Sequence, residues 1–405
     1  MPERLRMREL LTVEEYCAEL SRLVRPDERA EDVALAQASG RVLAEPVVGG
    51  VSVPGFDNSA MDGYAVRFAE VAAAPVKLRV AGEVPAGSPA DPAAGAGECV
   101  RIMTGAPMPG FADTVVPVED TDGGVGEVTV RRAPERAGAH VRRAGDDFAA
   151  GSLLAVAGAV LTPALVGALA AAGVTSAAVR PRPVVAVCAT GDELVSDGSP
   201  LRRGQIHDSN SLGLAAALTR DGAQPHRFEP VADRAEALAA WLDSVSADLV
   251  VVTGGASVGA YDVVRDVLQA AGGTFRHVRV QPGKPQGWAV WQGTPVVALP
   301  GNPLSASLSY EVFVRPLLDR RLGRGGPTWF TAVAAEGWSS PAGRRQLLPV
   351  RLTSASDGRL LATPAHARGS ASHVVTSLAA ADGIAAVAEE VTAVTAGDAV
   401  AVRWL

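Results

Sequence analysis

The sequence predicts a multidomain protein that combines an α/β domain with β-rich domains. At 405 residues the chain is longer than one hydrophobic core supports, so two to four domains are expected. Between residues 183 and 322, short apolar runs alternate with helical segments, which is typical of a parallel sheet covered by helices on both faces. Extended runs broken by Gly and Pro on either side indicate β-rich modules.

The first segment is predicted to be helical. Thr12 and Glu15 form a capping box that begins a helix through Tyr16–Val24. A second helix is expected over Ala30–Ala38, because Gly40 ends the pattern there.

A small β-rich module follows from about residue 51 to residue 130. Gly and Pro separate its short runs, so the runs are interpreted as strands. The expected strands are Val76–Val80, Cys99–Met103, Thr114–Val118 and Val125–Arg131. A helix is predicted next over Leu161–Val174, with Thr162 as its N-cap and Pro163 at its first position.

The α/β stretch is predicted as five strands and four helices. The expected strands are Val184–Ala189, Asp248–Thr253, Phe275–Val280, Trp288–Trp291 and Val296–Leu299. The expected helices are Ser211–Thr219, Arg234–Val245, Val263–Ala271 and Leu304–Leu322. The remaining stretch, Thr328–Leu405, is extended and indicates a small β-barrel or sandwich.

Composition argues against several classes of protein. The net charge of −7 and the lack of a basic tail give little support to generic nucleic-acid binding. The longest apolar stretch, Pro163–Val174, is too short to span a membrane, and the N-terminus has no apolar core of a secretory signal. Three widely spaced cysteines argue against a disulfide framework or a thiolate zinc site. The sequence therefore predicts a cytoplasmic protein.

Four loops follow predicted strands of the α/β stretch. Because ligands of such sheets bind at the carboxyl ends of the strands, these loops are expected to meet there. Their glycines and helix starts would direct backbone N–H groups at an anion. A lone Gly-rich turn is more often structural, and four together favour a site. The loops contain Thr190, Gly191, Asp192 and Glu193; Gly254, Gly255, Ser257 and Gly259; Gln281, Pro282, Gly283 and Lys284; and Pro300, Gly301, Asn302 and Pro303.

Acidic residues beside these loops indicate a divalent cation. Glu193, Asp262 and also Asp192 and Asp233 would lie next to a bound phosphate. Carboxylates and phosphates repel each other unless a cation bridges them, so Mg²⁺ is implied. Capping of a helix by Asp233 and a turn role for Asp192 are the structural alternatives.

Lysine usage singles out one further residue. Lys77 and Lys284 are the chain's two lysines, and Lys284 lies in the Gly-Lys-Pro turn of the third loop. Composition alone does not distinguish chance retention of Lys284 from a functional role for it.

Three polar loops lie far upstream of the α/β stretch. They contain the strings FDNSAMDGYA from Phe56, RIMTGA from Arg101 and RRAGDD from Arg142. Each could be ordinary turn chemistry, because Asp, Asn and Ser satisfy nearby backbone groups. The residues alone therefore predict a Mg²⁺-assisted site for a phosphate-bearing ligand, with accessory modules of unassigned role.

In this order, the strings resemble the molybdopterin molybdenumtransferase family, the MoeA type that also forms the E domain of gephyrin. The matching strings cover nearly the whole chain, and FDNSAMDGYA is long enough to be highly specific. They are VPGFDNSAMDGYAVR from Val53, RIMTGAPMP from Arg101, RRAGDD from Arg142, TGDEL from Thr190, GQIHDSN from Gly204, GGASVGAYD from Gly254, QPGKP from Gln281, LPGNPLSA from Leu299 and RGSAS from Arg368.

The resemblance implies four domains. Residues 1–50 with 140–180 would form a discontinuous elongated domain, and residues 51–139 would be a β-rich insertion in it. Residues 181–326 would form a molybdopterin-binding (MogA-like) α/β domain, and residues 327–405 a C-terminal β-barrel. The family's dimers also imply a homodimer whose cleft combines the α/β domain of one subunit with the N-terminal β-rich region of the other.

The implied function is molybdenum insertion. The substrates would be molybdate and adenylylated molybdopterin, the product would be molybdenum cofactor, AMP would be released and Mg²⁺ would be required. Molybdopterin adenylyltransferase and molybdoenzymes are the implied transient partners. The dithiolene sulfurs of the pterin would hold the molybdenum, so no protein Cys or His cluster is needed.

The family's functional positions carry over residue by residue. Glu193 and Asp262 would bind Mg²⁺, and Lys284 would supply positive charge to the pyrophosphate or molybdate. The glycines Gly254, Gly255 and Gly259 with Ser257 would hold phosphate. Asp62, Thr104, Asp147, Asp233 and Lys284 are further catalytic candidates, and Thr190, Gly191, Asp192, Pro282, Gly283, Pro300, Gly301, Asn302, Pro303 and Ser370 are binding candidates.

Some positions depart from the family pattern. The family commonly has lysines where this chain has His277 and Gln281, and an arginine near Pro349, which Arg345 or Arg351 could replace. His277 could compensate when protonated. These departures leave open how the oxyanion is bound and whether molybdate or tungstate is preferred.

Two rival functions remain. A molybdopterin adenylyltransferase shares the α/β fold and its GGxSxG-type loop, but that activity needs about the α/β segment alone. A non-catalytic carrier of molybdopterin or molybdenum cofactor is favoured by the replaced lysines. The retained Glu193, Asp262 and Lys284 favour an enzyme.

Overall fold

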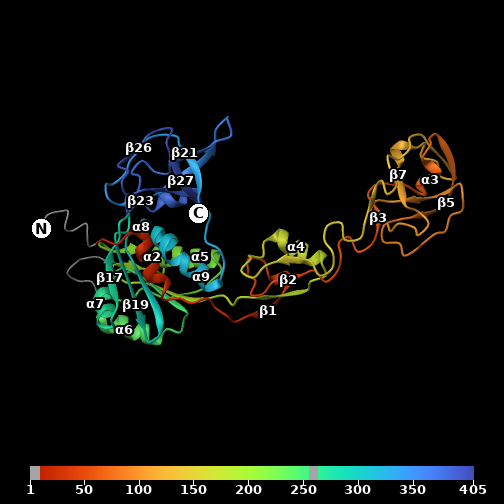
Figure 1. Cartoon of the computed structure of the whole chain (residues 1–405). Helices are drawn as coiled ribbons and strands as arrows, with labels where there is room; N and C mark the ends of the chain where they lie inside the picture. The colour runs from red at the N-terminus through yellow and green to blue at the C-terminus, as the bar shows by residue number, and fades with distance from the viewer. Residues whose placement is uncertain (1–9, 255–262) are drawn as a thin grey trace. The chain divides into compact units, whose positions relative to one another are not determined.

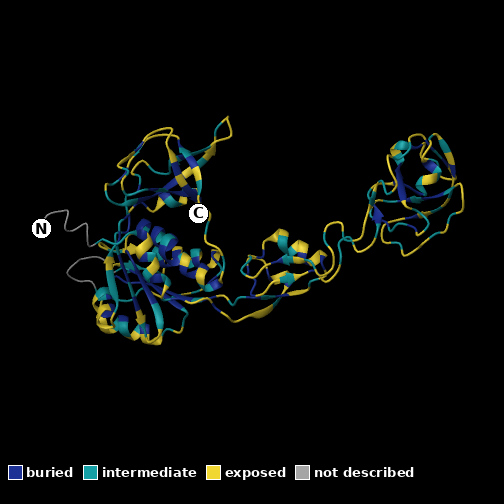
Figure 2. Ribbon diagram, viewed as in Figure 1, coloured by how far each residue is buried: buried dark blue, intermediate teal, exposed yellow. Residues whose placement is uncertain are grey.

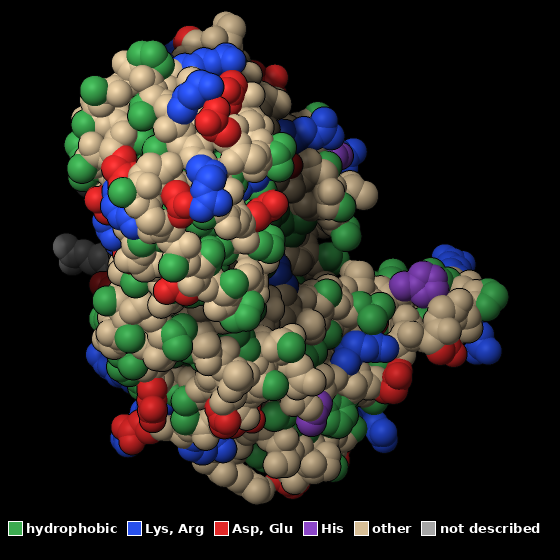
Figure 3. Space-filling model, turned by 90° about the vertical axis from the view of Figure 1, so that its right-hand side faces the viewer, with side chains coloured by type: hydrophobic (Ala, Val, Ile, Leu, Met, Phe, Trp, Pro, Cys, Tyr) green, Lys and Arg blue, Asp and Glu red, His purple; other side chains and the backbone are tan. Residues whose placement is uncertain are grey.

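The computed structural model describes residues 10–254 and 263–405, which divide into two compact units (Figure 1). Unit 1 contains residues 1–31, 40–44 and 180–405, and unit 2 contains residues 32–39 and 45–179. Within the described ranges, no helix is both long and apolar enough to cross a bilayer. Over the face drawn in Figure 3, basic and acidic side chains lie next to one another.

Unit 1 is built on a six-stranded mixed sheet. Its strand order is β15 (Gln224–Arg227), β12 (Val184–Ala189), β16 (Leu249–Thr253), β20 (Thr294–Leu299), β19 (Pro285–Trp291) and β17 (Thr274–His277). The first four strands are parallel, which agrees with the predicted parallel sheet, although β15 was not predicted as a strand. Strands β19 and β17 are antiparallel to their neighbours, which the prediction did not include. The turn Gln292–Gly293 joins β19 to β20, and two residues cannot make the long crossover that a parallel pair needs.

Helices cover both faces of this sheet. Alternate residues of β12 show the division: Val185 and Val187 pack under α2 (Val13–Ser21), α5 (Asn210–Arg220), α8 (Pro303–Ser309) and α9 (Arg315–Leu322). Ala186 faces the opposite layer, α6 (Ala235–Ser244) and α7 (Val263–Ala270). Figure 2 shows the strands as the buried layer between them. This confirms the predicted α/β domain.

The predicted long helix over Leu304–Leu322 contains a π-helical turn. Helices α8 and α9 are joined through Tyr310–Val314 (η4), and Tyr310, Glu311 and Phe313 are all buried. A π turn changes which side chains share a face, so an aromatic and an acidic neighbour both point into the interior. Nothing in the sequence pattern indicated this turn.

The C-terminal stretch is a closed barrel, which settles the choice between barrel and sandwich. Its strands follow the order β23 (Arg345–Ser354), β24 (Leu360–Pro364), β21 (Phe330–Ala334), β27 (Ala399–Trp404) and β25 (Gly383–Val387), and β25 pairs again with β23. The short strand β18 (Val280–Gln281) pairs in parallel with β23, and Leu347 and Ile384 join the sheet-side core. The barrel is therefore fixed to the α/β layers.

The first helix confirms one prediction, and the next segment contradicts another. Thr12 and Glu15 form the predicted capping box of α2. Residues 30–38, predicted as a helix, instead form β1 (Glu31–Ala34) and a short 3₁₀ turn (Leu35–Gln37). Strand β1 pairs with β11 (Ser176–Val179), so pairing with a segment distant in sequence overrides weak helix propensity.

Unit 2 contains a five-stranded sheet and several two-stranded ones. The larger sheet has the order β7 (Thr114–Pro117), β4 (Gly63–Val66), β6 (Glu98–Ile102), β5 (Val76–Val84) and β8 (Glu127–Val130). Four of these strands were predicted, and β4 was missed. The predicted helix is α4 (Pro163–Ala171), with Thr162 as its N-cap. The two-stranded sheets include β2 (Val47–Val48) with β10 (Leu153–Ala155), and β3 (Asn58–Ser59) with β9 (Val141–Arg142).

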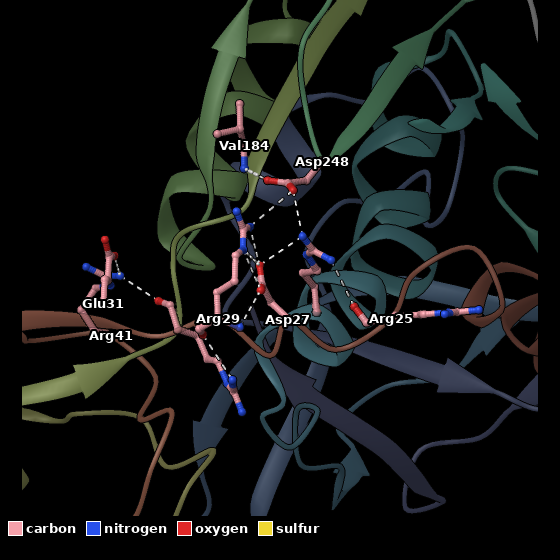
Figure 4. Close-up of polar contacts among 9 residues, drawn as sticks. Arg25, Asp27, Arg29, Glu31, Arg41, Val184 and Asp248 are labelled. Carbon is pink, nitrogen blue, oxygen red and sulfur yellow. Dashed lines mark hydrogen bonds and ion pairs between the residues drawn. The ribbon is translucent and has the colours of Figure 1, made fainter. Parts of the chain in front are cut away.

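An ion-pair cluster in unit 1 fixes the segment that leads out of α2. The buried Asp27 accepts hydrogen bonds from Arg29, whose Nη2 lies 2.6 Å away, and pairs with Arg321 of α9 at 3.1 Å (Figure 4). Arg321 also pairs with Asp248, and Asp248 accepts the N–H of Val184, which begins β12. The hydrogen bonds from Arg29 lower the pKa of Asp27 to about 2.

We expect Asp27→Asn to lower the free energy of unfolding of unit 1 by about 2 kcal/mol, because charge-assisted bonds to a buried carboxylate are lost. The folded-state pKa of Asp27 lies below its usual value, so this contribution is complete above about pH 4 and disappears as the pH falls toward 2. Urea unfolding at several pH values measures it. Glu28→Gln, at the exposed neighbouring residue, should change nothing, and an equal loss in both variants would contradict the prediction.

Candidate active site

A cavity of about 650 Å³ lies where β12, β16 and β20 end, and we call it the sheet-edge pocket. It lies at the edge where the sequence predicted the four loops to meet. Ten of the predicted site residues line it: Thr190, Glu193, Asp233, Gly254, Pro282, Gly283, Pro300, Gly301, Asn302 and Pro303. The third loop reaches this pocket although it follows β18 and not a strand of the parallel group.

Gly254 allows two of these loops to approach closely. Its φ of +95° lies in a region that L residues rarely adopt, and a Cβ built on it would be 2.5 Å from the carbonyl oxygen of Thr190. The N–H of Thr190 in turn donates to the carbonyl oxygen of Thr253 at 2.8 Å. A Cβ on Gly301 would lie 3.4 Å from the Cα of Gly254. Glycine at position 254 therefore allows the loops after three strands to pack together and line the sheet-edge pocket.

Carboxylates gather on one side of the pocket. Glu193 and Asp233 line it, and the side chain of Asp192 accepts the N–H of Asp233 at 3.2 Å. Partial burial raises the pKa of Asp233, and the negative charges of Asp192 and Glu193 act in the same direction, although Asp233 keeps contact with solvent. Helix α6 has Arg234 at its N-cap and no side-chain cap bond, so the alternative that Asp233 caps the helix is wrong.

The donor chemistry of this side fits Mg²⁺. Mg²⁺ usually takes one or two protein carboxylates and completes its shell with substrate phosphate oxygens and water. Glu193 and Asp233 can supply such oxygens. Across residues 10–254 and 263–405, no group of three or more His, Cys, Asp or Glu side chains is placed to hold a metal. The predicted second ligand, Asp262, lies outside the described residues, as do Gly255, Ser257 and Gly259.

Several polar residues of the pocket were not predicted as site residues. Asn210, at the start of α5, donates to the carbonyl oxygen of Gly301 at 2.7 Å, and Asn302 donates to Ser372 Oγ at 3.1 Å. The buried hydroxyl of Thr253 has no hydrogen-bond partner among the described residues. Asp208 and Ser372 also line the pocket. The string GQIHDSN was the one signal that could have identified Asp208 and Asn210.

Lys284 does not line the sheet-edge pocket, although its neighbours Pro282 and Gly283 do. Its positive charge acts on His277, whose pKa is lowered first by burial and then by Lys284 and Arg265. A lowered pKa works against protonation, so His277 is a poor replacement for a fixed cation near neutral pH.

A second cavity of about 650 Å³ lies against the barrel, and we call it the barrel pocket. Gln281 lines both pockets, and Ser370, a predicted site residue, lines this one. Of the arginines near Pro349, Arg345 pairs with Glu14 and Glu389, and Arg351 donates to the carbonyl oxygen of Ala380. Neither lines the barrel pocket. Arg344 does line it, and no sequence motif indicated this residue.

In unit 2, the three upstream loops meet. The Cα positions of Asn58 and Arg142 are paired across β3 and β9, and Ser59 exchanges backbone hydrogen bonds with Gly105 and Ala106. Asp57 accepts hydrogen bonds from Arg143 Nη1 at 2.6 Å and from the N–H of Ala144 at 2.8 Å.

Two of the predicted residues of unit 2 contact each other directly. Asp62 accepts hydrogen bonds from the N–H and the hydroxyl of Thr104 at 2.7 and 2.8 Å, and these bonds lower the pKa of Asp62. Asp147 is exposed, and its backbone N–H donates to Val53. Asp62 and Thr104 form a fixed, exposed pair that can contact a ligand.

Known proteins resemble this chain over nearly its whole length. Residues 11–173 match the MoeA N-terminal region (domain I and II), residues 186–320 match the probable molybdopterin binding domain, and residues 331–405 match the MoeA C-terminal region (domain IV). A relative from Mycobacterium tuberculosis, Molybdopterin molybdenumtransferase 2, is 42% identical over 96% of this chain and 98% of its own length.

Solved structures agree with these matches. Two molybdopterin biosynthesis MoeA proteins from Pyrococcus horikoshii have TM-scores of 0.77 and 0.82 at 33% and 25% identity. Each covers 98% of this chain, and this chain covers 99% and 100% of them.

Proposed function

Because this chain belongs to the molybdopterin molybdenumtransferase (MoeA) family, we propose that it inserts molybdenum from molybdate into adenylylated molybdopterin and releases AMP. One observation carries the proposal most directly: ten of the residues that the sequence suggested line one cavity at the strand ends. That cavity presents glycine-rich loops to an anion and carboxylates to a cation.

The pyrophosphate of the substrate fits the loop side of the sheet-edge pocket. Gly254, Gly283 and Gly301 bring backbone close to the cavity without side chains in the way, so N–H groups can donate to phosphate oxygens. The unpartnered hydroxyl of Thr253 can donate a further hydrogen bond. Asn210 and Asn302 hold the Gly301 turn and the Ser372 loop in place through their own hydrogen bonds.

Glu193 and Asp233 would hold Mg²⁺ between the protein and the phosphates, with Asp262 as the further predicted ligand. When bound, Mg²⁺ supplies positive charge that offsets the charge of the pyrophosphate. Asp192 accepts the backbone N–H of Asp233, which helps to hold Asp233 at the pocket. Molybdate is the second substrate, and the dithiolene sulfurs of the pterin supply its ligands.

The test is AMP release from adenylylated molybdopterin by purified protein with Mg²⁺, with and without micromolar molybdate. We expect molybdate-dependent release, lowered at least about 100-fold in Glu193→Ala because charge stabilisation at the pyrophosphate is lost. Glu236→Ala is the matched control, since Glu236 is an exposed carboxylate of α6 outside the pocket lining. Tight binding of the adenylylated pterin without release under any oxyanion would leave a carrier and exclude the enzyme.

We also propose that the protein is a homodimer that shares its cleft between subunits. In unit 2, Val48 and Leu153 are a cross-strand pair of β2 and β10, so their side chains lie on the same face, and both are more than half exposed. Val156 is also more than half exposed close by in sequence. An exposed apolar group of this kind favours burial against a second copy.

We expect the double variant Val48→Asp/Leu153→Asp to be monomeric in sedimentation velocity, because two desolvated carboxylates would oppose association. If the cleft is shared, molybdate-dependent AMP release should be lost together with dimerisation. Val125→Asp places the same charge at an exposed apolar position in unit 2 outside this pair and should stay dimeric. A monomeric parent protein, or a dimeric double variant, would contradict the proposal.

The cellular setting proposed here is the cytoplasm. The thiols of Cys17, Cys99 and Cys188 are free, which suits a reducing compartment. A molybdopterin adenylyltransferase would supply the substrate, and molybdoenzymes would receive the product.

A further inference from the structure

The barrel pocket contains two arginines, and the proposed reaction has not yet used it. It is lined by Arg344, His366 and Arg368, with the exposed Glu336 as its one acidic lining residue. Because Gln281 also lines the sheet-edge pocket, the two cavities adjoin. An anion in the barrel pocket would therefore lie next to a ligand in the other cavity.

Hydroxyl groups of the pocket are arranged to donate hydrogen bonds. Ser370 Oγ accepts from Gln346 Nε2 at 3.1 Å, so its own proton is directed elsewhere. Gln346 is held in that orientation because its Oε1 accepts the indole N–H of Trp338. Ser340 lines the same cavity, is more than nine-tenths buried, and its hydroxyl has no partner among the described residues.

Arg344 differs from the other arginines near the pocket in what it contacts. Its Nη1 donates to the neutral Oε1 of Gln281 at 2.8 Å, and among the described residues no carboxylate lies within ion-pair distance of it. The neighbouring Arg345 is neutralised by Glu14 and Glu389. Arg368 is exposed and contacts His373. The half-buried guanidinium of Arg344 is thus fixed in direction while its charge is not neutralised by a partner.

We infer that Arg344, oriented by Gln281, supplies the fixed positive charge that binds the molybdate oxyanion in the barrel pocket. The inference rests on the proposed function and deepens it, since it names the residue that sets oxyanion affinity. A guanidinium presents several N–H groups in a rigid fork, which suits a tetrahedral oxyanion. The hydroxyls of Ser340 and Ser370 complete the donor set, and the acidic lining residue Glu336 is exposed to solvent.

Gln281 has a second role in this arrangement. Because its side chain is neutral and accepts from Arg344, it leaves one positive charge at the boundary of the two pockets. A lysine at 281 would place an ammonium group against the guanidinium, and the two charges would repel each other. If Arg344 is replaced by a neutral residue, a lysine at 281 would place one positive charge on the other side of the same contact.

The experiment is calorimetric titration of the full-length protein with sodium molybdate, without any pterin. We expect Arg344→Gln to weaken binding about 30-fold, because a charge-assisted contact is removed. Arg344→Lys should weaken it less, by about fivefold, since the charge stays but the fork is lost. The double variant Gln281→Lys/Arg344→Gln should recover at least half of the loss on a logarithmic scale.

Arg359→Gln is the matched control, because Arg359 is an exposed arginine of the same barrel that pairs with Asp357. It should bind molybdate as the parent protein does. Unchanged affinity in Arg344→Gln, or no recovery in the double variant, would overturn the inference. If Arg344→Gln does not fold, Arg344→Lys decides: parental affinity in that variant likewise overturns it.

Failure of this inference and failure of the proposed function are distinguishable. Arg344-dependent molybdate binding without AMP release would reject the proposed reaction and support the oxyanion site. Normal molybdate-dependent AMP release with unchanged binding in Arg344→Gln would support the reaction and overturn the assignment of Arg344.

Discussion

Glu311→Leu is expected to lower the free energy of unfolding of unit 1 by about 4 kcal/mol, the cost of breaking a buried ion pair from one side. Glu311 lies in the π-helical turn and is 5% exposed. Its carboxylate accepts from Arg220 at 2.6 Å, from Arg315 at 3.2 Å and from Arg403 of β27 at 2.8 Å. Without it, the almost fully buried Arg403 has no carboxylate partner among the described residues.

Removing the other partner of this ion pair, Arg403, should lower the free energy of unfolding by less. In Arg403→Leu, Glu311 keeps two guanidinium partners, so no buried charge is left alone. We therefore expect Arg403→Leu to lower the free energy of unfolding by about 2 kcal/mol. Equal losses in the two variants would contradict the proposed asymmetry.

Tryptophan fluorescence during urea unfolding measures both variants. All six tryptophans lie between residues 241 and 404, so the signal reports unit 1 and is silent for unit 2. Asp357→Asn removes an exposed ion pair of the barrel and should shift stability by less than about 1 kcal/mol. A parental transition in Glu311→Leu would show that this network contributes nothing to stability.

Gly254→Ala is expected to lower molybdate-dependent AMP release about 100-fold, because displacement of a positioning loop by about 1 Å has effects of that size. A Cβ at this position would lie 2.5 Å from the carbonyl oxygen of Thr190 and 2.7 Å from its hydroxyl, and φ is +95°. The backbone must move to admit the methyl group, and it forms the wall of the sheet-edge pocket.

The matched control is Gly167→Ala in the exposed part of α4. A Cβ at Gly167 meets no atom within 4 Å, so the same substitution should leave activity unchanged. Titration with adenylylated molybdopterin separates a binding defect from a catalytic one. A parental rate in Gly254→Ala would mean that this loop does not position the substrate.

Local signals in the sequence predicted much of the fold. The capping box at Thr12 and Glu15 and the Thr162–Pro163 start of α4 are satisfied within one turn of the chain, so the sequence contains all that is needed to recognise them. The helix expected over residues 30–38 was wrong because part of this segment pairs as a strand with β11, more than 140 residues away. Strands β17 and β19 were predicted, but their antiparallel direction was not, because apolar runs do not reveal direction.

The site was predictable to a similar degree. Glycines and carboxylates at strand ends identified most of the lining of the sheet-edge pocket, because parallel strands bring their ends together. Arg344 was missed because Arg345 and Arg351 lie nearer to Pro349 in sequence, and only the pairing of β18 with β23 brings Arg344 to Gln281. The four-domain division and the roles of Lys284 and Asp262 remain predictions.

The packing of α2 has a consequence for synthesis of the chain. Tyr16 stacks edge-on against Phe313, and Cys17 contacts the carbonyl oxygen of Val312, so the first helix completes its core with residues almost 300 positions later. At ribosomal speeds of roughly 5–20 residues per second, α2 waits about 15 to 60 s for its partners. Unit 2, complete by residue 179, can fold during that interval. The apolar face of α2 therefore lacks its native partners until most of the chain has been synthesised.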